Sequence, residues 1–205
     1  MEQKNTKAEI LDAALDLFAI NGYESTSMSQ IAKAVGVRKA SIYSHFENKS
    51  EILKNVVQMV LDGYNMNSIF ANASWDDSEF TKDKSGMNAD DYAKLVKGHI
   101  RYIIHDPYVR KGRMLLVIEQ FRNEELSQLQ TKMNYEDIMK YFTGMINYLI
   151  KQDILVDANS EIMAAQFCLP ITTWINLCDR EPDRENEILE LIENHIKKFF
   201  EVYHS

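Results

Sequence analysis

The stretch SMSQIAKAVGVRKASIYSHFENKSEIL, residues 27–53, decides the fold of this 205-residue chain. Ser27 precedes an apolar-periodic segment and Gln30 follows three residues later, which is the spacing of a capping box at the start of a helix. Gly36 ends that segment, and a short second helix is predicted over about residues 39–46. Two helices joined by so tight a turn make a helix-turn-helix pattern.

The second helix of this pattern carries basic, small polar and aromatic side chains on the side that would face DNA. In helix-turn-helix proteins the N-terminal residues of the second helix meet base edges in the major groove. Arginine and lysine donate to guanine acceptors, a small Ala40 lets the helix lie deep, and helix N-termini such as those at Ser27 and Lys49 favour phosphate. Two basic residues on a short helix are also typical of an ordinary solvated surface. The predicted DNA contacts are Ser27, Arg38, Lys39, Ala40, Ser41, Tyr43, Ser44, His45 and Lys49.

Charge is unevenly distributed along the chain. The whole chain carries a net charge of −8, but residues 25–54 hold five basic and two acidic residues and so carry +3, which leaves −11 for the remainder. Because salt screens charges beyond about 8–10 Å, the field at a DNA contact is set locally, and the acidic remainder does not exclude binding by the basic segment. The same remainder argues against a protein that compacts nucleic acid without sequence preference.

Composition and the absence of known motifs argue against other classes of protein. Hydrophobic residues make up 45% of the chain, with seven glycines and three prolines, which favours long helices. Cys168 and Cys178 lack a CxxC pattern or a nearby His, so we expect buried thiols in a cytoplasmic protein and no metal site. GxSxG, HExxH, P-loop and GxGxxG motifs are absent, which argues against an enzyme. No cofactor, signal peptide, membrane span or membrane partner is expected.

Apolar periodicity predicts nine helices in an all-α fold. Asn21-Gly22 ends the first helix, Asn48 is the expected N-cap of the fourth, and Asp106-Pro107 breaks the chain further on. A polar segment, residues 72–88, is the predicted linker. The predicted helices cover about residues 5–20, 28–35, 39–46, 49–70, 90–105, 108–132, 135–152, 160–179 and 183–203.

The stretch from residue 13 to residue 53 resembles the N-terminal domain of TetR-family transcriptional regulators. The resemblance covers about a quarter of the chain by motif. The matching residues, all in register, are Ala14, Phe18, Gly22, Tyr23, Ser27, Ile31, Ala32, Gly36, Val37, Ser41, Tyr43, Phe46, Lys49 and Leu53.

This resemblance implies a nine-helix homodimer with a helix-turn-helix DNA-binding domain, residues 1–48, and an effector-binding and dimerisation domain, residues 49–205. It also implies a transcriptional regulator, in most cases a repressor, that a small molecule releases from a palindromic operator. Position 38 departs from the family, because Arg38 stands where a capping Ser is common. The helix loses a cap and gains a candidate base contact, so operator preference is not transferable. The alternative is an α-helical small-molecule-binding or enzymatic protein without a DNA role.

The resemblance places an effector pocket within about residues 90–180. Met and aromatic residues at helical spacing are more often core than ligand contacts, so each candidate also has a purely structural interpretation. Arg113, Glu119 and Thr173 could orient a ligand, although we expect Arg113 and Glu119 to be surface or paired groups. The candidate lining residues are His99, Tyr102, Met114, Ile118, Phe121, Tyr141, Met145, Phe167 and Trp174.

The last two helices are the predicted dimer interface. The final helix carries apolar residues around most of its girth, so we expect it to need two neighbours, its own chain and a partner. The preceding helix is also apolar nearly all round, and Pro170 is expected to kink it. Two such helices from each chain would form a four-helix interface with two-fold symmetry. The predicted interface stripe is Ile188, Leu191, Ile192, His195, Ile196, Phe199 and Tyr203.

Overall fold

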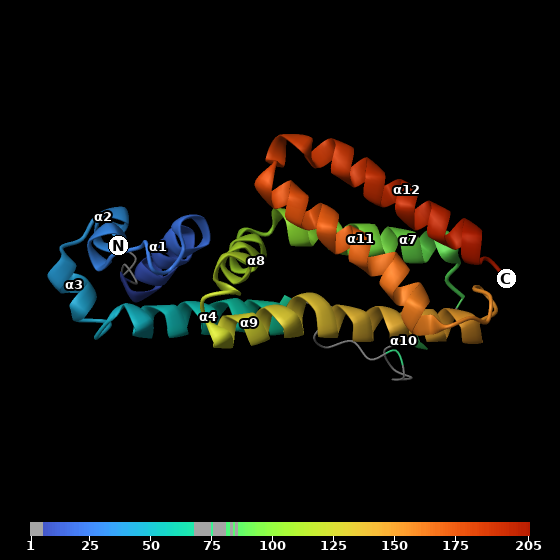
Figure 1. The fold of residues 1–205 in the computed structure, drawn as a ribbon, viewed down its shortest axis with the longest axis horizontal. Helices are drawn as coiled ribbons and strands as arrows, with labels where there is room; N and C mark the ends of the chain where they lie inside the picture. The colour runs from blue at the N-terminus through green and yellow to red at the C-terminus, as the bar shows by residue number, and fades with distance from the viewer. Residues whose placement is uncertain (1–5, 68–74, 76–80, 83, 85) are drawn as a thin grey trace. The chain divides into compact units, whose positions relative to one another are not determined.

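The computed structural model describes residues 6–67, 75, 81–82, 84 and 86–205, and regular structure in these residues is helical apart from one bridge between Leu155 and His204 (Figure 1). A π-helical turn, Lys132–Glu136, joins α9 to α10 without a break, so the described residues form nine continuous helices, as predicted. The helices are α1 (Thr6–Asn21), α2 (Met28–Val35), α3 (Lys39–Tyr43), α4 (Lys49–Asn67), α7 (Ala89–His105), α8 (Pro107–Glu119), α9 (Glu124–Thr131), α10 (Asp137–Lys151), α11 (Ser160–Arg180) and α12 (Glu185–Tyr203).

Most helix ends coincide with the predicted signals. Gly22 and Gly36 have positive φ angles of 81° and 77°, the left-handed conformation that ends α1 and α2. The Asn48 side chain accepts the Glu51 N–H at 2.9 Å and so caps α4 as expected. Asn88 begins α7 with a second capping box, which was not among the predicted signals.

The prediction of one unbroken helix over residues 108–132 is wrong, and so is the predicted break between residues 132 and 135. The chain leaves the helix after Glu119 and re-enters at Glu124, and the π-helical turn carries it on into α10. The signal for this break was present. The Asn123 side chain accepts the Leu126 N–H at 3.1 Å, and Glu124 and Glu125 in the first turn of α9 suit the helix dipole. The predicted end of the fourth helix at residue 70 and most of the predicted linker lie outside the described residues.

Contacts divide the chain into two compact units. The first unit comprises Met1–Asn67 and Pro107–Gln130, and the second comprises Ser68–Asp106 and Thr131–Ser205. In the first unit α8 packs against both α1 and α4. The packing is close because Gly112 on α8 has no side chain: a Cβ there would lie 2.6 Å from Cγ1 of Val60 on α4. The predicted boundary between the DNA-binding domain, residues 1–48, and the effector-binding and dimerisation domain, residues 49–205, falls at the first residue of α4. This assignment of functions to the two segments stays a prediction.

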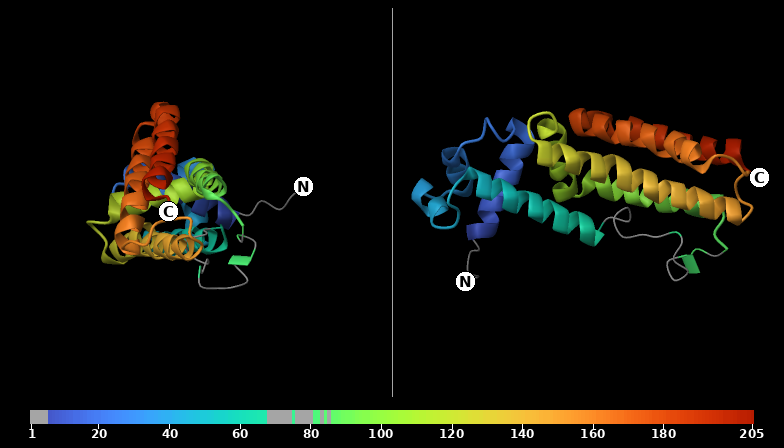
Figure 2. Two further views of the ribbon diagram at one scale, coloured as in Figure 1. Left: turned by 90° about the vertical axis from the view of Figure 1, so that its right-hand side faces the viewer. Right: turned by 60° about the horizontal axis from the view of Figure 1, so that its bottom comes forward.

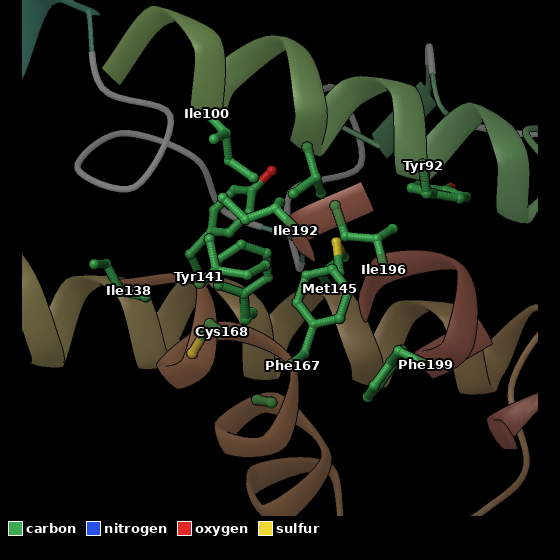
Figure 3. Close-up of a cluster of buried hydrophobic side chains, with 14 of the residues drawn as sticks. Tyr92, Ile100, Ile138, Tyr141, Met145, Phe167, Cys168, Ile192, Ile196 and Phe199 are labelled. Atoms are coloured by element: carbon green, nitrogen blue, oxygen red, sulfur yellow. The ribbon is translucent and has the colours of Figure 1, made fainter. Parts of the chain in front are cut away.

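The second unit has a dense aromatic and aliphatic core drawn from α7, α10, α11 and α12 (Figure 3). Phe167 on α11 lies at its centre, with ring centroids 5.1 Å from Phe142 and 4.8 Å from Phe199. Helices α11 and α12 lie side by side, as the orange and red ribbons of Figure 2 also show. No helix among the described residues is long and apolar enough to cross a membrane.

Candidate nucleic-acid interface

The helix-turn-helix begins with the predicted capping box. Ser27 Oγ accepts the Gln30 N–H at 3.2 Å, and Gln30 Oε1 accepts the Ser27 N–H at 2.7 Å. At the other end of α2, the N–H of Val37 donates to the Ala32 carbonyl at 3.0 Å across the left-handed Gly36. These two caps fix both ends of α2 and the direction in which the chain enters α3.

Helix α3 is anchored by its apolar side and presents the predicted DNA contacts on the other. Ile42 and Phe46 are 0% and 1% exposed, so the face opposite to them is turned outward. Ser41 is half-buried at the margin of this surface. The Ser44 hydroxyl donates a hydrogen bond to the Ser41 carbonyl at 2.7 Å. Ser27 at the start of α2 is exposed as well. The exposed residues of α3 and its flanks are Arg38, Lys39, Ala40, Tyr43, Ser44 and His45.

Two basic side chains open α3. Arg38 occupies the N-cap position with an extended backbone and makes no side-chain cap hydrogen bond, as its departure from a capping Ser suggested. The Arg38 side chain is exposed, so its guanidinium is accessible to a ligand outside the chain. The Lys39 ammonium lies 5.8 Å from the centroid of the Tyr43 ring, a cation–π distance that orients both side chains on the same exposed surface.

Lys49 has a different environment from the one predicted. Its Nζ donates to the carbonyl oxygens of Tyr23, Glu24 and Thr26 at 2.7, 3.3 and 2.9 Å, and lies 4.1 Å above the Tyr23 ring. An ammonium has three N–H donors, so these contacts use all of them. Lys49 thus ties the turn before α2 to the first residue of α4, and in this conformation it has no donor left for a phosphate.

The turn between α1 and α2 is approached by the end of α8. The Glu119 carboxylate accepts the Tyr23 N–H at 2.8 Å, and an added Cβ on Gly22 would lie 3.0 Å from Glu119 Oε1 and 3.3 Å from Ile118 Cγ2. Burial, followed by the charges of Glu24 and Glu119, raises the pKa of Tyr23. Both groups were predicted to be either at the surface or paired. Glu119 is 2% exposed and Arg113 is 8% exposed, so the surface alternative is excluded, and the Tyr23 N–H pairs with Glu119.

The two left-handed glycines allow a matched stability test. Gly36→Ala only forces an alanine into a left-handed backbone conformation, because no atom lies within 4 Å of the added Cβ. Gly22→Ala does the same and also crowds Glu119 and Ile118. We expect the free energy of unfolding to fall by about 1–2 kcal/mol for Gly36→Ala and by about 2–4 kcal/mol for Gly22→Ala. Urea denaturation measures both, and equal losses would contradict the close approach of α8.

The predicted effector residues fall in both units. Tyr141, Met145 and Phe167 are 2%, 0% and 0% exposed within the core of the second unit (Figure 3). Their burial agrees with the alternative that these residues are core rather than ligand contacts. Met114 and Ile118 are half-buried on α8 of the first unit. Phe121 is 91% exposed in the turn between α8 and α9, so in this structure it lines no enclosed cavity.

The remaining effector candidates lie on α7 and α11 of the second unit. His99 and Tyr102 are half-buried with ring centroids 5.9 Å apart, and burial lowers the pKa of His99 to about 4. A neutral imidazole at physiological pH can both donate and accept a hydrogen bond. Trp174 lies with its ring centroid 5.4 Å from His195 at the seam between α11 and α12.

A cleft of about 270 Å³ between α7 and α12 was not foreseen. Its lining combines Lys97 and Arg101 from α7 with Glu190 and Glu193 from α12, and Lys97 pairs with Glu193 at 2.7 Å. Such charged residues are common on helix surfaces, so the sequence offered no signal for it. Elsewhere in the described part of the chain, no group of three His, Cys, Asp or Glu side chains is placed to hold a metal ion.

The predicted dimer stripe on α12 is largely turned inward. Ile188, Ile192, Ile196 and Phe199 are at most 5% exposed and pack into the core of their own chain, where a partner would not touch them. His195 is half-buried, with Nε2 2.9 Å from the Phe167 carbonyl, and Tyr203 donates a hydrogen bond to Gln166. Leu191 is 40% exposed.

Comparison with known proteins agrees with this geometry. Residues 10–56 match the family described as bacterial regulatory proteins, tetR family. The HTH-type transcriptional regulator AcrR of Shigella flexneri is 43% identical over 58 residues, which are 28% of this chain and 27% of AcrR. The biofilm operon icaADBC HTH-type negative transcriptional regulator IcaR of Staphylococcus epidermidis is 42% identical over 52 residues, 25% of this chain and 28% of IcaR. The chain thus spans less than a third of the length of these curated relatives.

Solved structures resemble the chain over nearly its whole length. SmeT, the repressor of the Stenotrophomonas maltophilia multidrug efflux pump SmeDEF, gives a TM-score of 0.63 at 18% identity and covers 98% of this chain and 92% of its own. A TetR-family transcriptional regulator from Agrobacterium tumefaciens gives 0.64 at 16% identity, covering 98% and 99%. At such identities the likeness establishes the fold. The match over residues 10–56 shows that this segment is a helix-turn-helix domain of the tetR-family type found in bacterial regulatory proteins.

Proposed function

We propose that the protein is a sequence-specific DNA-binding transcriptional regulator that reads its operator with α3. The observation that carries this proposal is the outward face of α3, where Arg38, Lys39 and Tyr43 are exposed together beyond the capped turn at Gly36. Arginine and lysine donate to guanine N7 and O6, and an anchored helix holds them in a fixed register. Ser27, Ala40, Ser41, Ser44 and His45 remain proposed contacts.

For the regulator to act on a palindrome, we propose a two-fold dimer formed by the outer surfaces of α11 and α12. Helix α11 has no charged residue between Glu161 and Asp179, although Ile162, Gln166 and Thr173 are exposed. On α12 the exposed Leu191 and Val202 lie on one side of the helix, because they stand about three turns apart. An uncharged helical face with exposed aliphatic groups is typical of a homodimer interface. Of the predicted stripe, Leu191, His195 and Tyr203 are accessible to a partner.

We propose repression as the mode of action, with release by a small-molecule effector. The support is the match of residues 10–56 to the tetR family, together with the roles of IcaR as a negative regulator and of SmeT as a repressor. An effector that binds more tightly to a conformation unable to span the operator shifts the population off DNA, by no more than its differential affinity. The half-buried candidates remain proposed effector contacts, each within its own unit: Met114 and Ile118 in the first, and His99, Tyr102 and Trp174 in the second. The DNA partner places the proposed site of action in the cytoplasm.

The test is the affinity of the purified protein for DNA flanking its own gene against shuffled DNA of the same composition. We expect specific binding to be at least about 10³-fold tighter at physiological salt. The logarithm of the affinity should fall with log salt by about 0.9 for each phosphate neutralised. Equal affinity for both DNAs would favour a nucleic-acid compaction protein. Absence of any binding would favour a small-molecule-binding protein without a DNA role.

A further inference from the structure

Glu119 is a buried carboxylate at the last residue of α8 that contacts a backbone group in the turn just before the helix-turn-helix. It is 2% exposed, and its Oε1 accepts the Tyr23 N–H at 2.8 Å. A carboxylate inside a protein is costly unless hydrogen bonds replace the water it loses, whereas an aliphatic side chain of similar size would have no such cost. Its presence at this position therefore calls for a specific partner, and the Tyr23 N–H is that partner.

The same turn is held from its other side by Lys49. The Lys49 ammonium donates to the carbonyls of Tyr23 and Thr26 at 2.7 and 2.9 Å, so Tyr23 has its N–H bound by α8 and its carbonyl bound by α4. Within the turn, Thr26 Oγ1 donates to the Gly22 carbonyl at 2.9 Å. Thr26 directly precedes Ser27, the N-cap of α2, so the conformation of this turn sets where α2 begins.

We propose that Glu119 is a positioning residue for DNA binding. By accepting the Tyr23 N–H, it holds the turn of residues 22–26 in the conformation that aims α2 and α3 at the operator. This inference rests on the proposed function, because it assigns Glu119 a part in the same activity. Two further polar links from α8 to α1, Tyr108 to Asp12 and Lys111 to Asp16, attach to α1 before the turn.

The test compares Glu119→Ala with Glu119→Gln, and Tyr108→Phe serves as the matched control. Gln keeps a carbonyl oxygen that can accept the Tyr23 N–H, Ala removes it, and Tyr108→Phe removes a hydrogen bond that α8 makes elsewhere, at 3.2 Å to Asp12. Operator affinity is measured at a temperature at which all four proteins are folded, together with the amide exchange rate of Tyr23 by NMR. The denaturation midpoint of each protein is recorded alongside.

We expect Glu119→Ala to bind the operator about tenfold or more weakly with an unchanged salt slope, since no phosphate contact is lost. The Tyr23 amide should exchange at least about tenfold faster in this variant. Glu119→Gln and Tyr108→Phe should stay within about twofold of the original protein in both measurements. A purely structural role predicts instead a lower midpoint with the affinity of the folded protein unchanged.

Two results would overturn the inference. One is a folded Glu119→Ala variant that binds the operator like the original protein, and the other is a Glu119→Gln variant that loses as much affinity as Glu119→Ala. Failure of the original protein to bind any DNA specifically would be a failure of the proposed function, and the exchange rate of the Tyr23 amide would still report whether Glu119 holds the turn.

Discussion

Ile162→Asp or Leu191→Asp is expected to turn a dimer into a monomer that keeps its helical content and loses the operator. Ile162 and Leu191 are 57% and 40% exposed on α11 and α12, so the substitution disturbs no core. An unpaired carboxylate inside an apolar interface costs about 3–5 kcal/mol, or roughly 10²–10⁴-fold in dimer affinity. Because two half-sites are bound together, operator affinity should fall by at least about 100-fold. Sedimentation velocity and circular dichroism measure the mass and the helicity.

The matched control is Phe121→Asp, which places the same charge at a side chain that is 91% exposed outside the proposed interface. This variant should remain dimeric. Ile196→Asp and Phe199→Asp do not serve as interface tests, because these residues are 0% and 5% exposed in the core of their own chain and the substitutions would unfold it. An original protein that sediments as a monomer at micromolar concentration would contradict the dimer and the palindrome that follows from it.

Arg38→Ala and Lys39→Ala should each weaken operator binding by about 1–3 kcal/mol and relax the preference for one base. Both side chains are exposed at the start of α3, and Arg38 makes no cap hydrogen bond within the chain. The physical reason is the loss of a donor to a base edge, so the affinity for shuffled DNA should change much less. Fluorescence anisotropy at one salt concentration, with operators substituted base by base, measures both effects.

Lys140→Ala is the control for charge in this comparison, because it removes one exposed positive charge from α10, which is not part of the helix-turn-helix. Its operator affinity should match that of the original protein within about twofold, since Lys140 is not among the proposed base contacts. If Arg38→Ala and Lys39→Ala both bind like the original protein, α3 is not the recognition helix.

The sequence was sufficient to predict the elements whose signals are local. The Ser27–Gln30 capping box, the left-handed Gly36 and the Asn48 cap all depend on residues within four positions of one another, and all three are present. The family resemblance over residues 13–53 rests on the same local pattern. These signals give the helix-turn-helix its register, and with it the exposed face of α3.

Predictions that depended on the neighbours of a helix were less successful. The apolar periodicity of α12 identified Ile188, Ile192, Ile196 and Phe199 as one stripe, but periodicity does not say whether a stripe meets its own chain or a partner. Glu119 lies 96 residues from Tyr23, so no local pattern could predict their hydrogen bond. The break before α9 was predictable in principle, from an Asn cap followed by two acidic residues.

The central claim is that α3 of a dimer reads a specific palindromic DNA sequence. Its most direct test is the selection of bound fragments from a pool of random-sequence duplex DNA by the purified full chain, followed by sequencing. The enriched sequences should share an inverted repeat whose half-site centres lie about 10 base pairs, or a multiple of this, apart. In the selection with Arg38→Ala, at least one position of each half-site should lose its base preference. Enrichment of no sequence, or of a single half-site without a repeat, would contradict the account.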